Sequence, residues 1–126
     1  VEGESRGRRR RVFFTGDTGY SKQHFTEIGS RFGGFDLALL PIGGYEPRWF
    51  MRAQHVNPEE AVQIHRDVGA RVSVGIHWGT FQLTDEPLDQ PAIDLAAARE
   101  KLGVGRREFV TLRHGQTLRL DPFDKP

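Results

Sequence analysis

The chain has 126 residues, 37% of them hydrophobic and 28% charged, which is enough for one domain with a modest core. It contains no cysteine, so disulfides, thiolate metal sites and a cysteine nucleophile are excluded, and His, Asp and Glu remain as ligands for zinc, iron or manganese. The net charge of +1 gives no reason to expect a nucleic-acid partner. No apolar run approaches the roughly 18 residues of a membrane span, and no signal-peptide pattern follows Val1, so we expect a location in the cytoplasm or at a membrane surface.

Residues 1–11 are polar and carry a basic cluster formed by Arg6 and residues 8–11. Such a cluster can bind phosphate or an anionic surface. It can equally be a solvated hairpin loop that leads into the first strand. Both interpretations stay open here, because the run is short and the overall charge is nearly balanced.

The apolar patterns predict strands that alternate with helices. Residues 12–15 have the β-branched and aromatic side chains of a buried strand, and Ser21 is a suitable N-cap for a helix that ends before Gly33. The same reasoning gives strands at 36–42 and 71–76, helices at 57–69 and 91–103, and a terminal hairpin with arms at 108–112 and 117–120. The predicted order is β-α-β-α-β-α-β-β, an α/β domain with its functional loops at the carboxyl ends of parallel strands.

Two possible metal ligands, Asp17 and His77, each follow a predicted strand. Taken alone, Asp17 between Gly16 and Thr18 is explained by turn chemistry, and His77 beside Trp78 by packing. Taken together, they are expected at the same edge of a parallel sheet, where α/β folds place their sites. A catalytic zinc normally has three protein ligands and a water, so these two residues alone do not complete a site.

The other histidines do not have the sequence spacing that is typical of metal ligands, because no pair is arranged as HxH or HxxxH. His65 borders the apolar stripe of its helix and is expected to be structural, whereas His24 is expected on the surface. His55 precedes a helix and follows an aromatic stretch, which favours a place in a pocket. His114 is explained by turn chemistry in the predicted hairpin.

Several longer motifs resemble those of metallo-β-lactamase-fold hydrolases. Residues 14–20 (Phe-Thr-Gly-Asp-Thr-Gly-Tyr) resemble the GDTGY segment of that superfamily. Residues 40–51, 54–61 and 76–81 are similar to the branch that contains N-acyl-phosphatidylethanolamine-hydrolysing phospholipase D. The resemblance extends over residues 12–120.

This resemblance implies a role for each matching residue. Asp17 would bridge two Zn²⁺ ions, and His77 would complete the ligands of the second ion, so both are expected to be catalytic and metal-binding. The remaining matches are expected to bind substrate: Gln54 and His55 in the cavity, His114 near its mouth, and Trp49 and Phe50 in a pocket wall or a membrane-facing wall, with an ordinary packed loop as the alternative for the last two.

One departure from the family pattern is large, because the main metal motif HxHxDH is missing. The resemblance therefore implies that residues 1–126 form a single partial domain, the C-terminal half of an αββα sandwich. The intact protein would be a binuclear zinc phosphodiesterase that acts on phospholipid-like substrates, and a metal-dependent lactonase or sugar-phosphate hydrolase is the alternative within the fold. The isolated chain is expected to be inactive and to bind metal weakly or not at all, because two ligands are too few. A third possibility is a non-catalytic half-domain that pairs with its missing half, another chain or a second copy of itself.

Overall fold

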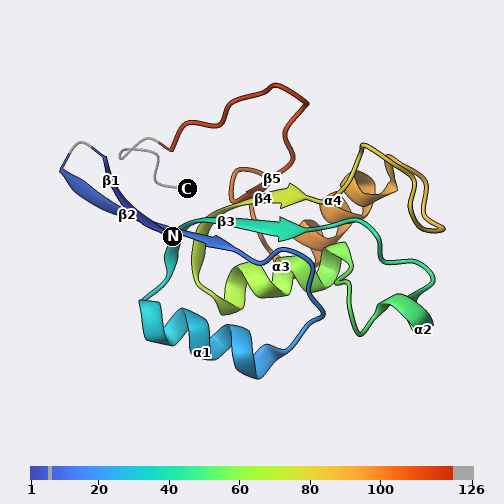
Figure 1. The fold of residues 1–126 in the computed structure, drawn as a ribbon, viewed down its shortest axis with the longest axis horizontal. Helices are drawn as coiled ribbons and strands as arrows, with labels where there is room; N and C mark the ends of the chain where they lie inside the picture. The colour runs from blue at the N-terminus through green and yellow to red at the C-terminus, as the bar shows by residue number, and fades with distance from the viewer. Residues whose placement is uncertain (6, 121–126) are drawn as a thin grey trace.

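A five-stranded sheet organises the described part of the chain, residues 1–5 and 7–120 of a computed structural model (Figure 1). The strands lie side by side in chain order: β1 (Glu2–Ser5), β2 (Arg8–Phe14), β3 (Phe35–Pro41), β4 (Ala70–Ile76) and β5 (Phe109–Val110). β1 and β2 are antiparallel, and the pairs from β2 to β5 are all parallel. The carboxyl ends of β2, β3 and β4 therefore meet at one edge of the sheet, as the strand–helix–strand pattern predicts.

The basic N-terminal cluster is largely part of this sheet. Glu2 pairs with Arg11 in the β1–β2 register, and the Arg11 Nε donates to Glu2 Oε1 over 2.8 Å. Arg10 forms an ion pair of 2.9 Å with Asp36, at the start of β3. The cluster therefore belongs to a hairpin whose arms are the strands β1 and β2 and not a loop, with the Arg11–Glu2 ion pair across them. Arg6 lies outside the described residues.

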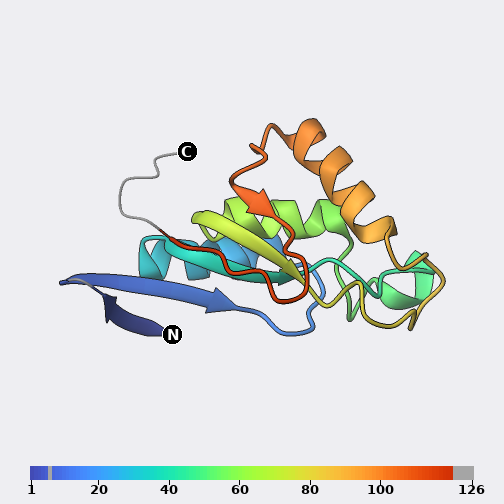
Figure 2. The same ribbon diagram turned by 90° about the horizontal axis from the view of Figure 1, so that it is seen from above.

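The helices are α1 (Lys22–Phe32), α2 (Arg48–Met51), α3 (Pro58–Asp67) and α4 (Gln90–Leu102). α1 and α3 lie along the same face of the sheet, and α4 packs beside α3 near β5 (Figure 2). The helices α1, α3 and α4 begin and end close to the residues that the capping signals predicted. The Asn57 side chain accepts a hydrogen bond from the Glu60 N–H, and Glu60 reaches back to the Asn57 N–H, which is a full capping box.

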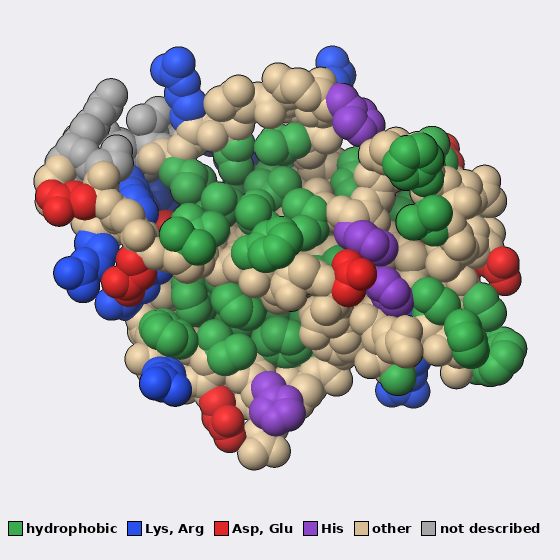
Figure 3. Space-filling view, in the orientation of Figure 1, with side chains coloured by type: hydrophobic (Ala, Val, Ile, Leu, Met, Phe, Trp, Pro, Cys, Tyr) green, Lys and Arg blue, Asp and Glu red, His purple; other side chains and the backbone are tan. Residues whose placement is uncertain are grey.

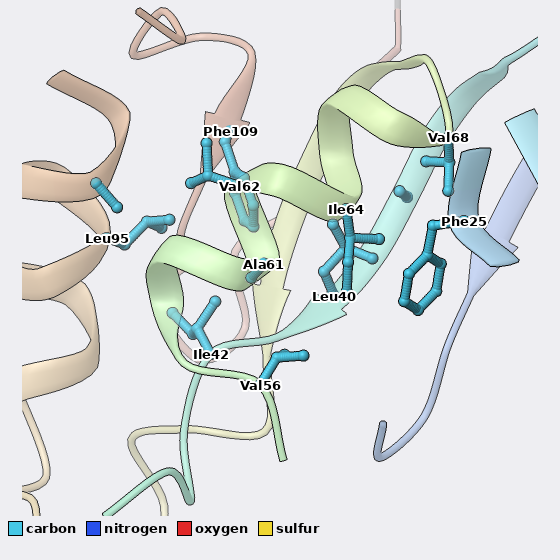
Figure 4. Close-up of a cluster of buried hydrophobic side chains, with 12 residues drawn as sticks. Phe25, Leu40, Ile42, Val56, Ala61, Val62, Ile64, Val68, Leu95 and Phe109 are labelled. Atoms are coloured by element: carbon cyan, nitrogen blue, oxygen red, sulfur yellow. The ribbon is translucent and has the colours of Figure 1, made fainter. Parts of the chain in front are cut away.

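The core lies between the sheet and these helices (Figure 4). Leu40 from β3 and Ile64 from α3 are fully buried there, with Phe109 from β5 and Leu95 from α4 at its other end. Burial of a large apolar side chain of this kind contributes roughly 1.5–3 kcal/mol to stability. The core therefore fixes the loops at the sheet edge relative to one another.

The opposite face of the sheet is only partly covered. Strand residues point alternately to the two faces, so Ala38 and Leu40 face the helices whereas Leu37 and Leu39 face away and are half-exposed. Phe14, at the end of β2, is 60% exposed. Figure 3 shows a broad apolar area on the face of the molecule seen in Figure 1. An apolar area of this kind indicates a surface that another part of a protein covers.

The predicted terminal hairpin is wrong in part. Residues 109–110 form β5, but residues 117–120 are not a strand. The turn itself is present, because the Gln116 N–H donates to the Arg113 carbonyl over 2.9 Å. β5 pairs in parallel with β4, through Ser73 with Phe109 and Val74 with Val110. Alternating side chains indicate only that a segment has two different faces, so they could not tell a paired strand from this extended crossing segment.

Candidate metal centre

The sheet edge brings Asp17 and His77 together. β2 and β4 are separated by β3, and the loops that follow β2 and β4 carry the two residues. The Nε2 atom of His77 lies 3.4 Å from Oδ1 of Asp17. Two ligands of a tetrahedral zinc are about 3.3 Å apart, because each lies about 2.0–2.1 Å from the ion. The spacing of this pair therefore fits a shared metal ion.

His77 has an unusual backbone, with a φ of 60° in the left-handed region. A side chain other than glycine is strained there, by roughly 1–2 kcal/mol. The Nδ1 atom lies 3.1 Å from the Gly43 carbonyl oxygen, so Nδ1–H donates to it and Nε2 stays free to bind a metal. Only glycine fits at position 43, because a Cβ there would collide with the His77 carbonyl. The strained backbone of His77 thus coincides with a ring orientation that brings Nε2 close to Asp17.

His55 is the third member of the group. Its ring stacks on that of His77, with centroids 5.4 Å apart and planes at 23°. Its Nδ1 is buried and has no hydrogen-bond partner among the described residues. The backbone is held from two sides, because the His55 N–H donates to Met51 and the His55 carbonyl accepts from Arg48, both over 2.8 Å. Because buried polar atoms normally have a hydrogen-bond partner, this nitrogen beside a second imidazole is a candidate for binding a ligand.

One ligand atom from each of Asp17, His55 and His77 lies within 4.8 Å of the others. Figure 3 shows histidine and acidic side chains meeting near the middle of this face. The side chain of Asp17 is 61% exposed and that of His77 is 30% exposed, so the group opens to the surface. One carboxylate and two neutral imidazoles are a donor set that zinc and similar divalent ions prefer. The residues present therefore fit a metal ion, as one side of its coordination sphere.

The other residues predicted to bind substrate, Gln54, His114, Trp49 and Phe50, are not among the three candidate ligands. His114 Nε2 is 3.4 Å from the Thr80 hydroxyl, and both His114 and Trp78 line an open cavity of about 1230 Å³. Trp49 and Phe50 form α2 and are 85% and 67% exposed, with their rings 5.7 Å apart. Gln54 is exposed on the same loop. The stretch predicted as an aromatic loop therefore contains a short helix that presents its rings to the surface.

The other two histidines agree with their predicted structural places. His24 is exposed on α1. His65 is buried on α3, where Nδ1 lies 2.8 Å from the Ser73 hydroxyl on β4. Burial lowers its pKa, although Glu108 acts in the opposite direction. His65 therefore joins a helix to the sheet and lies apart from the metal group.

The sequence spacing predicted two metal ligands, and the structure adds His55 to them. Its ring reaches His77 only through the fold, because the chain turns after α2 and runs back toward the sheet edge before α3 begins. Neither HxH nor HxxxH spacing marks it. The sequence signals for His55 were its position between an aromatic stretch and a strong helix start and the family resemblance, which implied a place in the substrate cavity and not a metal ligand.

Comparison with known proteins identifies the family. The family described as Beta-lactamase superfamily domain matches residues 4–78. The chain belongs to the beta-lactamase superfamily. Its mixed α/β sheet with helices is consistent with half of a metallo-β-lactamase-type fold, which confirms the predicted fold class. Asp17 follows β2 and His77 follows β4, and both lie near the third candidate ligand, His55.

Individual relatives show which members of the superfamily this chain resembles. The chain is 48% identical over 115 residues to N-acyl-phosphatidylethanolamine-hydrolyzing phospholipase D 1 of Caenorhabditis elegans. The matched segment covers 87% of the chain and 32% of the relative. It is 48% identical over 81 residues to the mitochondrial N-acyl-phosphatidylethanolamine-hydrolyzing phospholipase D of Saccharomyces cerevisiae, covering 64% of the chain and 17% of the relative. An uncharacterised Mycobacterium tuberculosis protein is 50% identical over 97 residues, or 75% of the chain and 25% of that protein. The chain thus spans about a third or less of the length of these relatives.

Proposed function

We propose that this superfamily domain is the part of a metal-dependent hydrolase that holds one side of its metal centre, and that the intact protein cleaves phosphodiester bonds in phospholipid-like substrates. The observation that carries the proposal is the meeting of Asp17, His55 and His77 at the carboxyl edge of the sheet. The names of the relatives from Caenorhabditis elegans and Saccharomyces cerevisiae support the reaction class.

Each residue of the group has a distinct task in this proposal. A bound metal ion, for which we propose Zn²⁺, would polarise a phosphoryl oxygen and make a hydroxide nucleophile available at neutral pH. Asp17 supplies a carboxylate with two oxygens, so it can contact two ions at once, as the family resemblance implies. His77 supplies Nε2, with its ring held by Gly43. His55 supplies its unpartnered Nδ1, as a ligand or as a hydrogen-bonding group for the substrate.

Apolar surface near the group supports a lipid-like substrate. The open cavity is lined by Trp78, Leu88 and Leu112, with Asp89 and His114 among its polar walls. It includes Trp78, the neighbour of His77 in the chain, but none of the three candidate ligands lines it. A phospholipid needs this combination of an apolar wall for its chains and polar groups for its head. A lactonase or sugar-phosphate hydrolase, the alternative within the fold, would need a small polar pocket instead.

A location at a membrane surface is part of the same proposal. Trp49 and Phe50 are large, exposed and adjacent, and aromatic side chains of this kind favour the boundary between lipid and water. None of the described helices has the length and apolar character to cross a bilayer. We therefore propose peripheral contact with the lipid through α2.

The proposal is tested on the full-length protein, by measuring bound metal and the hydrolysis of an N-acyl-phosphatidylethanolamine in mixed micelles. We expect bound zinc and turnover that a chelator removes and added zinc restores. An Asp17→Asn variant should lose turnover and stay folded. Full-length protein without bound metal, or with turnover that the chelator leaves unchanged, contradicts the proposal.

The open sheet face favours a second candidate, a half-domain that has no activity of its own. Phe14 is 60% exposed, and Leu37 and Leu39 beside it are half-exposed, so a stable fold gains from covering them. In this view the chain associates with the other half of the domain, with another chain or with itself. Size-exclusion chromatography of the isolated chain decides it: a monomer that stays soluble at high concentration contradicts the candidate.

A further inference from the structure

His77 and Glu86 lie in the same loop, between β4 and α4, and the Glu86 carboxylate joins this loop to the one that follows β3. Glu86 is 8% exposed and lies in the loop between β4 and α4. Its Oε1 accepts hydrogen bonds from the Gly44 N–H at 2.5 Å and the Tyr45 N–H at 3.3 Å, and its Oε2 accepts one from the Glu46 N–H at 3.0 Å. A single side chain therefore satisfies three successive backbone donors of the loop that follows β3.

The loop that Glu86 holds is also the wall of the metal group. The Gly43 carbonyl accepts the hydrogen bond from His77 Nδ1. A Cβ on Gly44 would lie 3.2 Å from Cε1 of His77 and 3.7 Å from Nδ1 of His55, so this residue faces both rings. Residues 44–46 thus bind the Glu86 carboxylate through their N–H groups, while Gly43 and Gly44 lie against the imidazoles.

Glu86 keeps its negative charge in this place. Burial raises its pKa, but the hydrogen bonds from the Thr84 side chain and the backbone outweigh burial, so its pKa is lower than usual. A charged acceptor makes shorter and stronger hydrogen bonds than a neutral one, so it fixes the direction of the loop carbonyls more firmly. The direction of the Gly43 carbonyl decides which nitrogen of His77 carries the proton.

We propose that Glu86 is a positioning residue of the metal group, which acts through the backbone of residues 43–46 to hold His77 with Nδ1 protonated and Nε2 free. This inference rests on the proposed function, because it assigns Glu86 to the metal site described there. Glu86 does not contact the metal itself, since its carboxylate oxygens face the three backbone N–H groups.

The test compares the wild-type chain with Glu86→Gln, which keeps the shape of the side chain and removes the charge. Glu108→Gln is the matched control, because Glu108 Oε2 also accepts a glycine N–H, that of Gly105 at 2.5 Å, away from the metal group. The first measurement is the tautomer of His77 in the metal-free chain, from the ¹⁵N shifts of its ring. We expect mainly Nδ1–H in the wild type and the control, and a mixture of tautomers in Glu86→Gln.

The second measurement is a Zn²⁺ titration of the full-length protein and of its Glu86→Gln and Glu108→Gln variants, because the isolated chain carries only one side of the metal centre. We expect the affinity of Glu86→Gln to be about 10- to 100-fold weaker than that of the wild type, as for other groups that orient metal ligands. Thr84→Val, which removes one hydrogen bond to the same carboxylate, should shift both readouts in the same direction by less. It serves as the decisive variant if Glu86→Gln does not fold.

The two measurements separate the possible failures. Full-length wild-type protein that binds no Zn²⁺ would count against the metal site in the proposed function, while the tautomer still tests the role of Glu86. If the folded Glu86→Gln, or Thr84→Val in its place, keeps the wild-type His77 tautomer and a Zn²⁺ affinity within about twofold, the positioning role is overturned and Glu86 serves loop stability alone.

Discussion

Nε2 of His77 and Oδ1 of Asp17 lie 3.4 Å apart, although they follow different strands with a third strand between them. Without a metal, this is a weak contact between exposed groups. With a metal, both atoms are already placed as neighbouring ligands. The relation explains why the chain tolerates a strained φ of 60° at His77.

Replacing Asp17 should affect the metal and leave the fold intact. We expect Asp17→Asn to weaken Zn²⁺ binding by more than the roughly 10- to 100-fold that an orienting group contributes, because an amide is a poorer ligand than a carboxylate. Its unfolding free energy should be unchanged, because the side chain is 61% exposed. A Zn²⁺ titration and a urea unfolding curve measure the two effects. Asp89→Asn, a change to another exposed carboxylate, is the control, and equal losses in both variants would contradict the assignment.

The backbone strain at His77 predicts an order of stability between two variants. His77→Gly and His77→Ala both lose the ring and its hydrogen bond to Gly43. Glycine relieves roughly 1–2 kcal/mol of left-handed strain but costs about 0.5–1 kcal/mol in the entropy of the unfolded chain. We therefore expect His77→Gly to be more stable than His77→Ala by about 0.5–1 kcal/mol in urea unfolding. An alanine variant of equal or greater stability would mean that the strain is absent in solution.

Stability should fall in mild acid because of His65. Its folded pKa is lowered from 6.5 by burial, so the unfolded chain binds a proton more readily than the folded one. The stability that this difference gives is complete above about pH 6.5 and is lost as pH falls from there toward the folded pKa. We expect His65→Gln, which does not titrate, to show a flatter dependence of unfolding free energy on pH. His24→Gln, at an exposed position, should keep the wild-type slope, and identical slopes in all three proteins would contradict the prediction.

Replacing Gly29 by alanine should lower the stability of the protein, whereas the same change at an ordinary helix glycine raises it. Glycine to alanine inside a helix usually stabilises by about 1 kcal/mol. Here a Cβ would collide with the Asp67 carbonyl and lie 2.9 Å from the Val68 Cα, at the end of α3. We expect Gly29→Ala to lower the unfolding free energy by about 1–3 kcal/mol, the usual cost of overpacking. Ser30→Ala on the same helix is exposed and should be neutral or stabilising, and thermal melting of both compares them.

The exposed rings of α2 predict binding to lipid. We expect Trp49→Ser to reduce the fraction of the chain that sediments with phosphatidylethanolamine vesicles, because an interfacial indole is lost. Phe32→Ser removes an exposed ring from α1, at a different place in the fold, and should bind as the wild type does. Equal sedimentation of the wild type and Trp49→Ser would refute contact through α2.

Local sequence signals predicted the ends of helices well where the capping residues lie next to the helix in the chain. Asn57, Pro58 and Glu60 begin α3 as expected, because the capping groups lie within one turn of each other. Gly33 ends α1 in the left-handed conformation that glycine adopts readily. The prediction of a strand at 117–120 was wrong because strand pairing depends on a neighbouring strand, which an alternating pattern does not specify.

The sequence by itself determined the order of the elements, the parallel strands that bring Asp17 and His77 to one edge, and the likeness to a metal-binding superfamily. It could do so because turn residues, caps and ligand motifs are contiguous along the chain. Only the tertiary structure decided that His55 stacks on His77 and that the Glu86 carboxylate binds the N–H groups of residues 44–46, of which Gly44 lies next to both rings. Those contacts join loops that are distant in the sequence, and their distances depend on how the core packs the helices and strands that carry the loops.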